Sequence, residues 1–225
     1  MRVAWLQSPA WMLLVPWLMA TPSIAGSSAR FVAGEVIVQF APDSDGHRVV
    51  TQASGQPAPD LADFAPIVTR LTTTTSIPLT TKQLLSGQRL LLKIDAIRIV
   101  HETARRLREN PGVRTAGLDE TGSGSSQSSS AGVPIRVEFT QDSALNRLLA
   151  EGANNLDSPA RQKLLADLQA GLAIPLTVRT VYRDTVLLDV DLPALTRLTV
   201  QRLSTVSDIK DAQLNYLLSI RTPEP

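Results

Sequence analysis

The chain contains the segment Gly34-Glu-Val-Ile-Val-Gln-Phe-Ala-Pro-Asp-Ser44 and, at an offset of 99 residues, the similar segment Pro134-Ile-Arg-Val-Glu-Phe-Thr-Gln-Asp-Ser143. In each segment apolar residues alternate with polar ones, which predicts a β-strand with one buried face. The apolar positions correspond: Val36 matches Ile135, Val38 matches Val137 and Phe40 matches Phe139. The chain therefore has two halves that begin with the same element.

A second pair of similar segments lies near the end of each half. Arg89-Leu-Leu-Leu-Lys-Ile-Asp95 aligns with Thr185-Val-Leu-Leu-Asp-Val-Asp191 at an offset of 96 residues. At the same offset, Thr103, Arg106 and Leu107 correspond to Thr199, Arg202 and Leu203. Two pairs of similar segments at nearly constant offset indicate an internal duplication.

Each half is predicted to close with a strand, a helix and a further strand. Asp95 can cap the first of these helices, and Asn110-Pro-Gly112 can end it. Its apolar stripe is expected at Ile97, Val100, Ala104 and Leu107. In the second half Pro193 suits a first helical turn. The closing strands are expected at 113–118 and 213–220.

The opening part of each half is expected to place helical structure before a two-stranded hairpin. In the second half, Ser143 and Ser158-Pro159 can start two helices, and strands are predicted at 176–182 and 186–190. In the first half we expect one short helix and a long threonine-rich connection over 72–87. Both halves then follow the order β-α-β-β-α-β. This order predicts an α+β protein with two tandem ferredoxin-like domains, each an antiparallel sheet with its helices on one face.

Composition divides the chain into four parts. Residues 1–25 are expected to be a signal peptide, because Arg2 precedes an apolar run and small residues end at Ala25, so the mature chain would begin at Gly26. Residues 121–132 contain mainly Gly and Ser and are expected to be a flexible linker. The two domains are expected at 30–120 and 133–221. An N-terminal anchor that is never cut is the alternative for 1–25, and both imply export.

Several classes of function are disfavoured by composition. Without the one basic residue of 1–25 the chain carries 21 basic and 21 acidic residues, and it has few aromatic residues, so no nucleic-acid partner is expected. There is no cysteine, which suits an exported bacterial protein, periplasmic or secreted. The apolar run within 1–25 is too short to span a bilayer. No stable insertion in a membrane is expected after the signal peptide is cleaved.

Catalytic and metal-binding patterns are also missing from the sequence. His47 and His101 stand without metal-ligand spacing, and there is no Gly-x-Ser-x-Gly motif. We therefore expect no cofactor, no metal and no enzymatic activity, and an enzyme has the least support among the possible classes.

Two parts of the first half resemble the prodomains of subtilases. Phe31-Val-Ala-Gly-Glu-Val-Ile-Val-Gln-Phe40 is similar to the opening strand of those prodomains. Leu90-Leu-Leu-Lys-Ile94, a helix, and Glu109-Asn-Pro-Gly-Val113 followed by Ala116 are similar to their ending. The resemblance covers about 30–120 and includes the second half only through its similarity to the first. It implies a ferredoxin-like fold that inhibits, or assists the folding of, a subtilisin-like serine protease.

The resemblance also implies a protease-binding surface. Such prodomains lay the open face of their sheet on the enzyme and send the chain after the last strand into the active-site cleft. By alternation the open face of the first domain would show Ile37, Gln39, Leu91 and Lys93, and the first tail would be Ala116, Gly117, Leu118 and Asp119. In the second domain the corresponding face would show Arg136, Glu138, Leu187 and Asp189.

Two further readings of these residues stay open. Leu91 and Leu187 are apolar residues on open sheet faces, so we expect another surface to cover them. A protease, the other sheet or a neighbouring chain could supply that surface. The expected partner is a subtilisin-like protease or another exported protein. The alternative function is a periplasmic structural or protein-interaction module that keeps the fold without protease binding.

Overall fold

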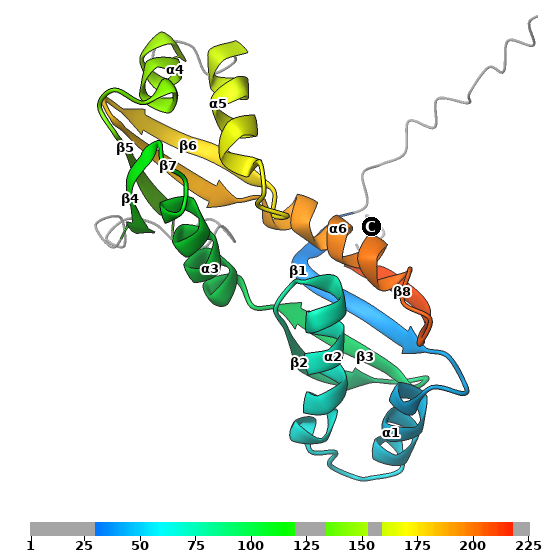
Figure 1. Cartoon of the computed structure of the whole chain (residues 1–225). Coiled ribbons are helices and arrows are strands. Elements are labelled where there is room, and N and C mark those ends of the chain that lie inside the picture. Colours follow the sequence, from blue (N-terminus) through cyan, green and yellow to red (C-terminus); the bar gives the residue numbers. More distant parts are fainter. Residues whose placement is uncertain (1–29, 120–133, 153–158, 218–225) are drawn as a thin grey trace, which may run out of the picture.

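The computed structural model describes residues 30–119, 134–152 and 159–217, which form two four-stranded antiparallel sheets and six α-helices (Figure 1). The expected mixed α+β class is confirmed. In chain order the elements are β1 (Phe31–Phe40), α1 (Asp45–Ser54), the 3₁₀ helix η1 (Leu61–Phe64), α2 (Ala65–Thr75), β2 (Leu79–Leu85), β3 (Arg89–Ile94), α3 (Ala96–Arg108), β4 (Val113–Leu118), β5 (Ile135–Phe139), α4 (Ala144–Gly152), α5 (Pro159–Gln169), β6 (Leu176–Tyr182), β7 (Thr185–Val190), α6 (Leu192–Leu203) and β8 (Ile209–Tyr216).

The two halves of the chain exchange their last strands. Sheet A has the order β2-β3-β1-β8, and sheet B has the order β4-β5-β7-β6. The first half thus gives β4 to the sheet of the second half, and the second half gives β8 to the sheet of the first. The expectation that each half closes its own sheet is therefore wrong at the fourth strand, and the ranges 30–120 and 133–221 each contribute to both sheets. We call α3 with β4 (96–118) the first arm and α6 with β8 (192–216) the second arm.

The arms leave their halves at two equivalent aspartates. The backbone N–H of Asp95 donates to the carbonyl of Pro78 at 3.0 Å, and that of Asp191 donates to the carbonyl of Pro175 at 3.0 Å. Each aspartate side chain then accepts a bond from the first turn of the next helix and caps it, as predicted for Asp95. Because each helix starts directly after its strand, the chain crosses from one sheet to the other without a loop.

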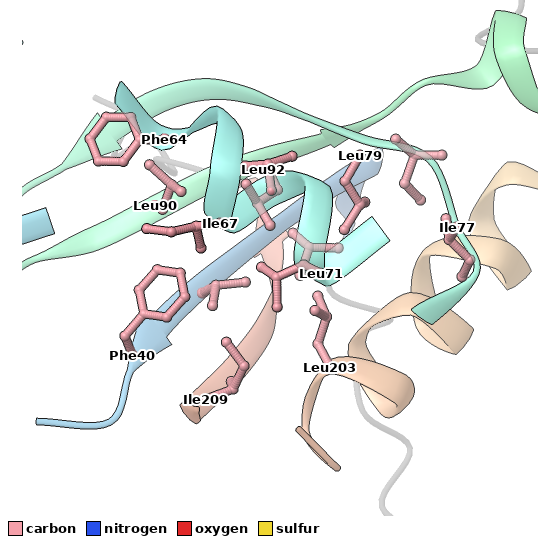
Figure 2. Packing of buried hydrophobic residues seen from close by; sticks show 14 of the residues in the cluster. Phe40, Phe64, Ile67, Leu71, Ile77, Leu79, Leu90, Leu92, Leu203 and Ile209 are labelled. Atoms are coloured by element: carbon pink, nitrogen blue, oxygen red, sulfur yellow. The ribbon is translucent and has the colours of Figure 1, made fainter. Parts of the chain in front are cut away.

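Each hydrophobic core combines residues from both halves. In sheet A the inward-facing residues of β1 and β3 pack beneath α1 and α2. The second arm completes this core with Leu195, Leu203 and Ile209, and Figure 2 shows Leu203 and Ile209 directed toward the cluster that contains Leu71 and Phe40. The first arm completes the core of sheet B with Val100, Ala104, Leu107, Val113 and Ala116. The arms are thus structural parts of the sheets they join.

Three local expectations need correction. The expected connection over 72–87 contains the end of α2 and the strand β2 (Leu79–Leu85), and Thr72 to Thr75 are helical because α2 buries Leu71 and Thr75 against sheet A. Ile97 is 70% exposed, and the buried residue of this turn of α3 is Ile99. The last strand begins at Ile209, four residues before the expected start.

The Gly/Ser-rich range 121–132 connects neighbouring strands of one sheet. β4 and β5 are antiparallel partners, and their last pair before this range is Leu118 with Ile135. The range therefore does not join the two sheets, which are connected instead at Asp95 and Asp191. Residues 1–25 and the expected cleavage after Ala25 lie outside the described residues. Within the described part, no helix is long and apolar enough to cross a membrane.

Candidate functional site

The face of sheet A opposite its helices carries the four sheet residues predicted for protease binding. α1, α2 and α6 pack on the face that presents Val36, Val38 and Phe40, so alternation turns Ile37 and Gln39 to the other side. Leu91 is the Cα partner of Ile37, and Lys93 is the partner of Glu35. Ile37, Gln39, Leu91 and Lys93 are therefore neighbours on one surface, which we call the open face of sheet A.

Across the open face of sheet A, the central row runs through all four strands. It consists of Gln83, Leu91, Ile37 and Gln213, which pair in this order from β2 to β8. One neighbouring row has Leu85, Arg89, Gln39 and Asp211, and the other has Thr80, Lys93 and Glu35. The surface therefore has a small apolar centre, Leu91 and Ile37, with one further apolar residue, Leu85, on the edge strand and polar or charged side chains of both signs at the other positions.

Leu91 is shielded within the chain itself. It is only 5% exposed, although it belongs to neither hydrophobic core and no helix of the described residues lies over its face. The two sheets lie in separate lobes and do not pack face to face, so sheet B does not cover Leu91 (Figure 1). Because so little of Leu91 is exposed, a partner would gain little by burying it further. The accessible groups of the surface are Ile37, Gln39 and Lys93.

A buried carboxylate ties the second arm to this surface. Glu35 is 7% exposed and forms an ion pair with Lys82 of β2. Its other oxygen accepts a hydrogen bond from Asn215 of β8 at 2.8 Å. Glu35 lies on β1 next to Gly34, whose φ of +85° accompanies an irregularity in the pairing with β8. One side chain thus links strands of both halves. A buried carboxylate needs such partners, because a buried charge is unfavourable unless it is paired and hydrogen-bonded.

The open face of sheet B differs from that of sheet A in its centre. Its central row is Thr180, Leu187, Arg136 and Gly117, so a charged residue stands where sheet A has Ile37. Glu138 pairs with Arg114 at 3.0 Å, and Asp189 pairs with Arg179 at 2.8 Å. The four residues expected on this face do lie there, but three of them are charged. An apolar pair is present only on sheet A.

The residues expected to form the first tail lie in sheet B instead. Ala116, Gly117 and Leu118 belong to β4 and pair with Val137, Arg136 and Ile135. Ala116 is 6% exposed within the core of sheet B, and the N–H of Asp119 donates to the carbonyl of Pro134 at 2.9 Å. They are thus separated from the open face of sheet A, and Ala116 cannot enter a cleft without opening sheet B.

The strand that ends beside the open face of sheet A is β8. Phe31 pairs with Tyr216, and the N–H of Leu217 donates to the carbonyl of Arg30 at 2.8 Å. Gln213 and Asn215 of this strand belong to the surface, and sequence reasoning missed both because it assigned them to the other domain. The signal that could have included Glu35 was the Gly-Glu pair of the opening strand.

Other chemistry is sparse in the part of the chain that the structure describes. No group of three His, Asp or Glu side chains there could hold a metal ion. A hollow of about 450 Å³ lies between the ends of α3 and α5, where Arg105 is already paired with Glu109. No protein-family model matches the chain, and no curated protein or solved structure is significantly similar to it.

Proposed function

We propose that this protein is an exported, non-catalytic inhibitor or folding chaperone of a subtilisin-like serine protease, and that it binds the protease through the open face of sheet A. The proposal includes two ferredoxin-like units, in which β8 acts as the fourth strand of the first and β4 as the fourth strand of the second. The residue pattern of 30–120, which resembles subtilase prodomains, supports both statements.

The observation that carries the proposal is the apolar centre on an uncovered sheet. Ile37 is partly exposed between Leu91 and Gln213, and polar side chains surround this row. A small apolar centre with a polar rim is the usual composition of a transient protein interface. Sheet B has Arg136 at the corresponding position, so binding is assigned to sheet A alone.

The proposed tail is the chain that follows β8. The resemblance implies a segment that continues from the last strand of the binding sheet into the protease cleft. In sheet A that strand is β8, and the sequence continues after Tyr216 as Leu-Leu-Ser-Ile-Arg-Thr-Pro-Glu-Pro225. This segment replaces Ala116 to Asp119 in the proposal.

Placing the central residue of sheet B at the corresponding position of sheet A should weaken inhibition. Ile37→Arg introduces the residue that sheet B carries at the same register, so the fold should accept it. A charge in the apolar centre should raise the inhibition constant at least tenfold, because the guanidinium loses water without a partner. The measurement is residual activity of a panel of subtilisin-like proteases titrated with the mature chain and with this variant.

Arg136→Ile is the matched control. It makes the converse change on sheet B and should leave the inhibition constant within about threefold, which is less than 1 kcal/mol. No inhibition by the unaltered chain at micromolar concentration would contradict the protease assignment. Equal effects of the two variants would contradict the assignment to sheet A.

Removal of 218–225 should convert competitive inhibition into simple binding. The last described residues, Tyr216 and Leu217, remain in the truncated chain with their pairing to Phe31 and Arg30, so sheet A should stay intact. We expect the truncated chain to bind the protease while the active site stays open to a small peptide substrate. Isothermal titration together with substrate hydrolysis tests this, and undiminished competition with substrate would remove the tail from the proposal.

A protein-interaction module is the second candidate. It is favoured by the burial of Ala116 and Asp119 in sheet B, which departs from the free tail that the resemblance implies. On this reading the open face of sheet A binds an exported protein that is not a protease. Absence of inhibition across the panel, with loss of a partner on Ile37→Arg, would favour it.

A further inference from the structure

The two arms pair with their sheets in the same register. In sheet A the Cα partners along β1 and β8 are Phe40 with Ile209, Gln39 with Asp211, Val38 with Ala212, Ile37 with Gln213 and Val36 with Leu214. In sheet B the partners along β5 and β4 are Phe139 with Val113, Glu138 with Thr115, Val137 with Ala116, Arg136 with Gly117 and Ile135 with Leu118. With offsets of 99 residues for the central strands and 96 for the arms, each of these five pairs in one sheet corresponds to a pair in the other.

The helices of the arms carry buried residues at corresponding positions. Buried residues of α3 recur in α6 at the offset of 96: Thr103 with Thr199, Leu107 with Leu203, and Ile99 with Leu195, of which Ile99 and Leu195 both lie in the core of sheet A. The turn before each arm strand also makes the same bond, since Ala41 N donates to Asp208 O at 2.9 Å and Thr140 N donates to Gly112 O at 3.0 Å. Side-chain direction in a strand depends on register, so either arm presents its apolar side to either core.

The range between β4 and β5 is longer than the observed topology needs. Neighbouring antiparallel strands can be joined by two residues, yet 119–134 comprises sixteen residues. Sixteen residues reach up to about 55 Å when extended. A range of this length could connect the two lobes if β4 lay in sheet A and β5 in sheet B.

From the equal registers and this length we infer that the chain has a second arrangement, in which each arm returns to the sheet of its own half. The first arm then lies beside β1 and the second arm beside β5. Apolar contacts of the same kind form in both arrangements. The population of the two is therefore decided by the few contacts that differ between the arms.

Two polar contacts favour the exchanged arrangement. Thr196 Oγ1 accepts a bond from the N–H of Gly34 at 2.7 Å, and the first arm has Val100 at this position, which has no acceptor. Asn215 donates to Glu35, and the corresponding residue directly after the first arm is Asp119, which would bring two carboxylates together. Loss of one buried bond should change the ratio of the two arrangements about tenfold.

Engineered disulfides distinguish the arrangements, because the natural chain has no cysteine. Ile37→Cys with Gln213→Cys, and Arg136→Cys with Gly117→Cys, join Cα partners of the exchanged form. Ile37→Cys with Gly117→Cys, and Arg136→Cys with Gln213→Cys, would be partners only in the second form. Opposed residues of antiparallel strands have the Cα separation that a disulfide needs. Each variant is refolded from urea in a glutathione buffer, and its disulfide is identified by peptide mass.

The exchanged pairs serve as controls, because each cysteine position occurs in one of them. We expect both exchanged pairs to form disulfides, and the two other pairs to form them within the monomer in a minor fraction. If these pairs stay reduced while the exchanged pairs oxidise, the second arrangement is refuted. If their disulfides join two chains, the arms exchange between copies instead, and the inference is equally wrong.

Changing the two biasing contacts should shift the ratio. Thr196→Val with Asn215→Asp gives the second arm the residues of the first at both positions, and should raise the yield of the disulfide between positions 37 and 117 by tenfold or more. Thr199→Val is the matched control, since Thr103 occupies the same position in α3 and the hydroxyl of Thr199 bonds within its own helix. An equal rise in the control would contradict the assigned bias.

Discussion

Cleavage of the chain within 121–132 should leave one particle of unchanged mass. Each fragment would hold an arm of the other's sheet: the first retains α3 and β4 in sheet B, and the second retains α6 and β8 in sheet A. Separation would expose core residues of both lobes, such as Leu107 and Leu203, and each fully buried side chain of this size contributes about 1.5–3 kcal/mol. The fragments should therefore stay associated at micromolar concentration.

A protease recognition sequence placed in this range allows the experiment. The cut protein should give two bands on a denaturing gel and a single peak of intact mass in size-exclusion chromatography with light scattering. The uncut chain with the same insertion is the control. Two half-sized peaks under native conditions would mean that the halves are independent domains at 30–120 and 133–221, as the Gly/Ser composition alone suggests.

A cavity in either core should destabilise both lobes together. Phe40 is 1% exposed in the core of sheet A, and Phe139 is fully buried in the core of sheet B. Replacement of a buried phenylalanine by alanine costs about 3–5 kcal/mol, a large part of the stability of a typical domain. Because Ile99 of α3 belongs to the core of sheet A, and Ile174 and Val190 pack against both cores, Phe40→Ala should lower the unfolding midpoint of both sheets.

The sequence provides a separate probe for each lobe. All three tryptophans lie in the first 19 residues, so a chain that begins at Gly26 has two tyrosines as its main fluorophores, Tyr182 in sheet B and Tyr216 in sheet A. In urea titrations, Tyr182→Phe leaves Tyr216 as the fluorophore of sheet A, and Tyr216→Phe leaves Tyr182 as the fluorophore of sheet B. Both probes should shift equally in Phe40→Ala, whereas the exposed Thr177→Ala should move neither by more than about 0.5 kcal/mol. A shift confined to Tyr216 would contradict the coupling.

Alternation and capping were sufficient to predict most of the elements. β6 occupies the expected range 176–182 and β4 the expected range 113–118, because turn residues bound both segments, although one irregularity in each strand interrupts the alternation. The exchange of the arms could not be predicted. Val113 and Ile209 have the same place in the same register, and a period of two reports which face is buried but not which neighbour a strand has.

The candidate surface was predictable only in part for the same reason. Ile37 and Leu91 share a face because each stands between inward-facing residues of its own strand, which the sequence displays directly. Whether Gln213 belongs to the surface depends on which strand pairs with β1. The position of Ala116, which pairs with Val137 in the other sheet, depends on the same choice. The helix over Thr72 to Thr75 was missed because β-branched residues disfavour helices, and the hydroxyl bonds to the preceding turn appear only in the folded chain.

The pairing of β1 with β8 determines how the molecule would respond to mechanical load. Arg30 and Leu217 lie opposite each other at one end of the two strands, and a backbone hydrogen bond of 2.8 Å joins them. A tension applied through the two ends of the chain would load this pair of residues first. The hydrogen-bonded pairs of β1 and β8 would then separate one after another, and the whole strand would not be sheared at once. A low force would detach β8 from β1 and expose the backbone edge of β1. Sheet B would carry no load until α6 had also detached.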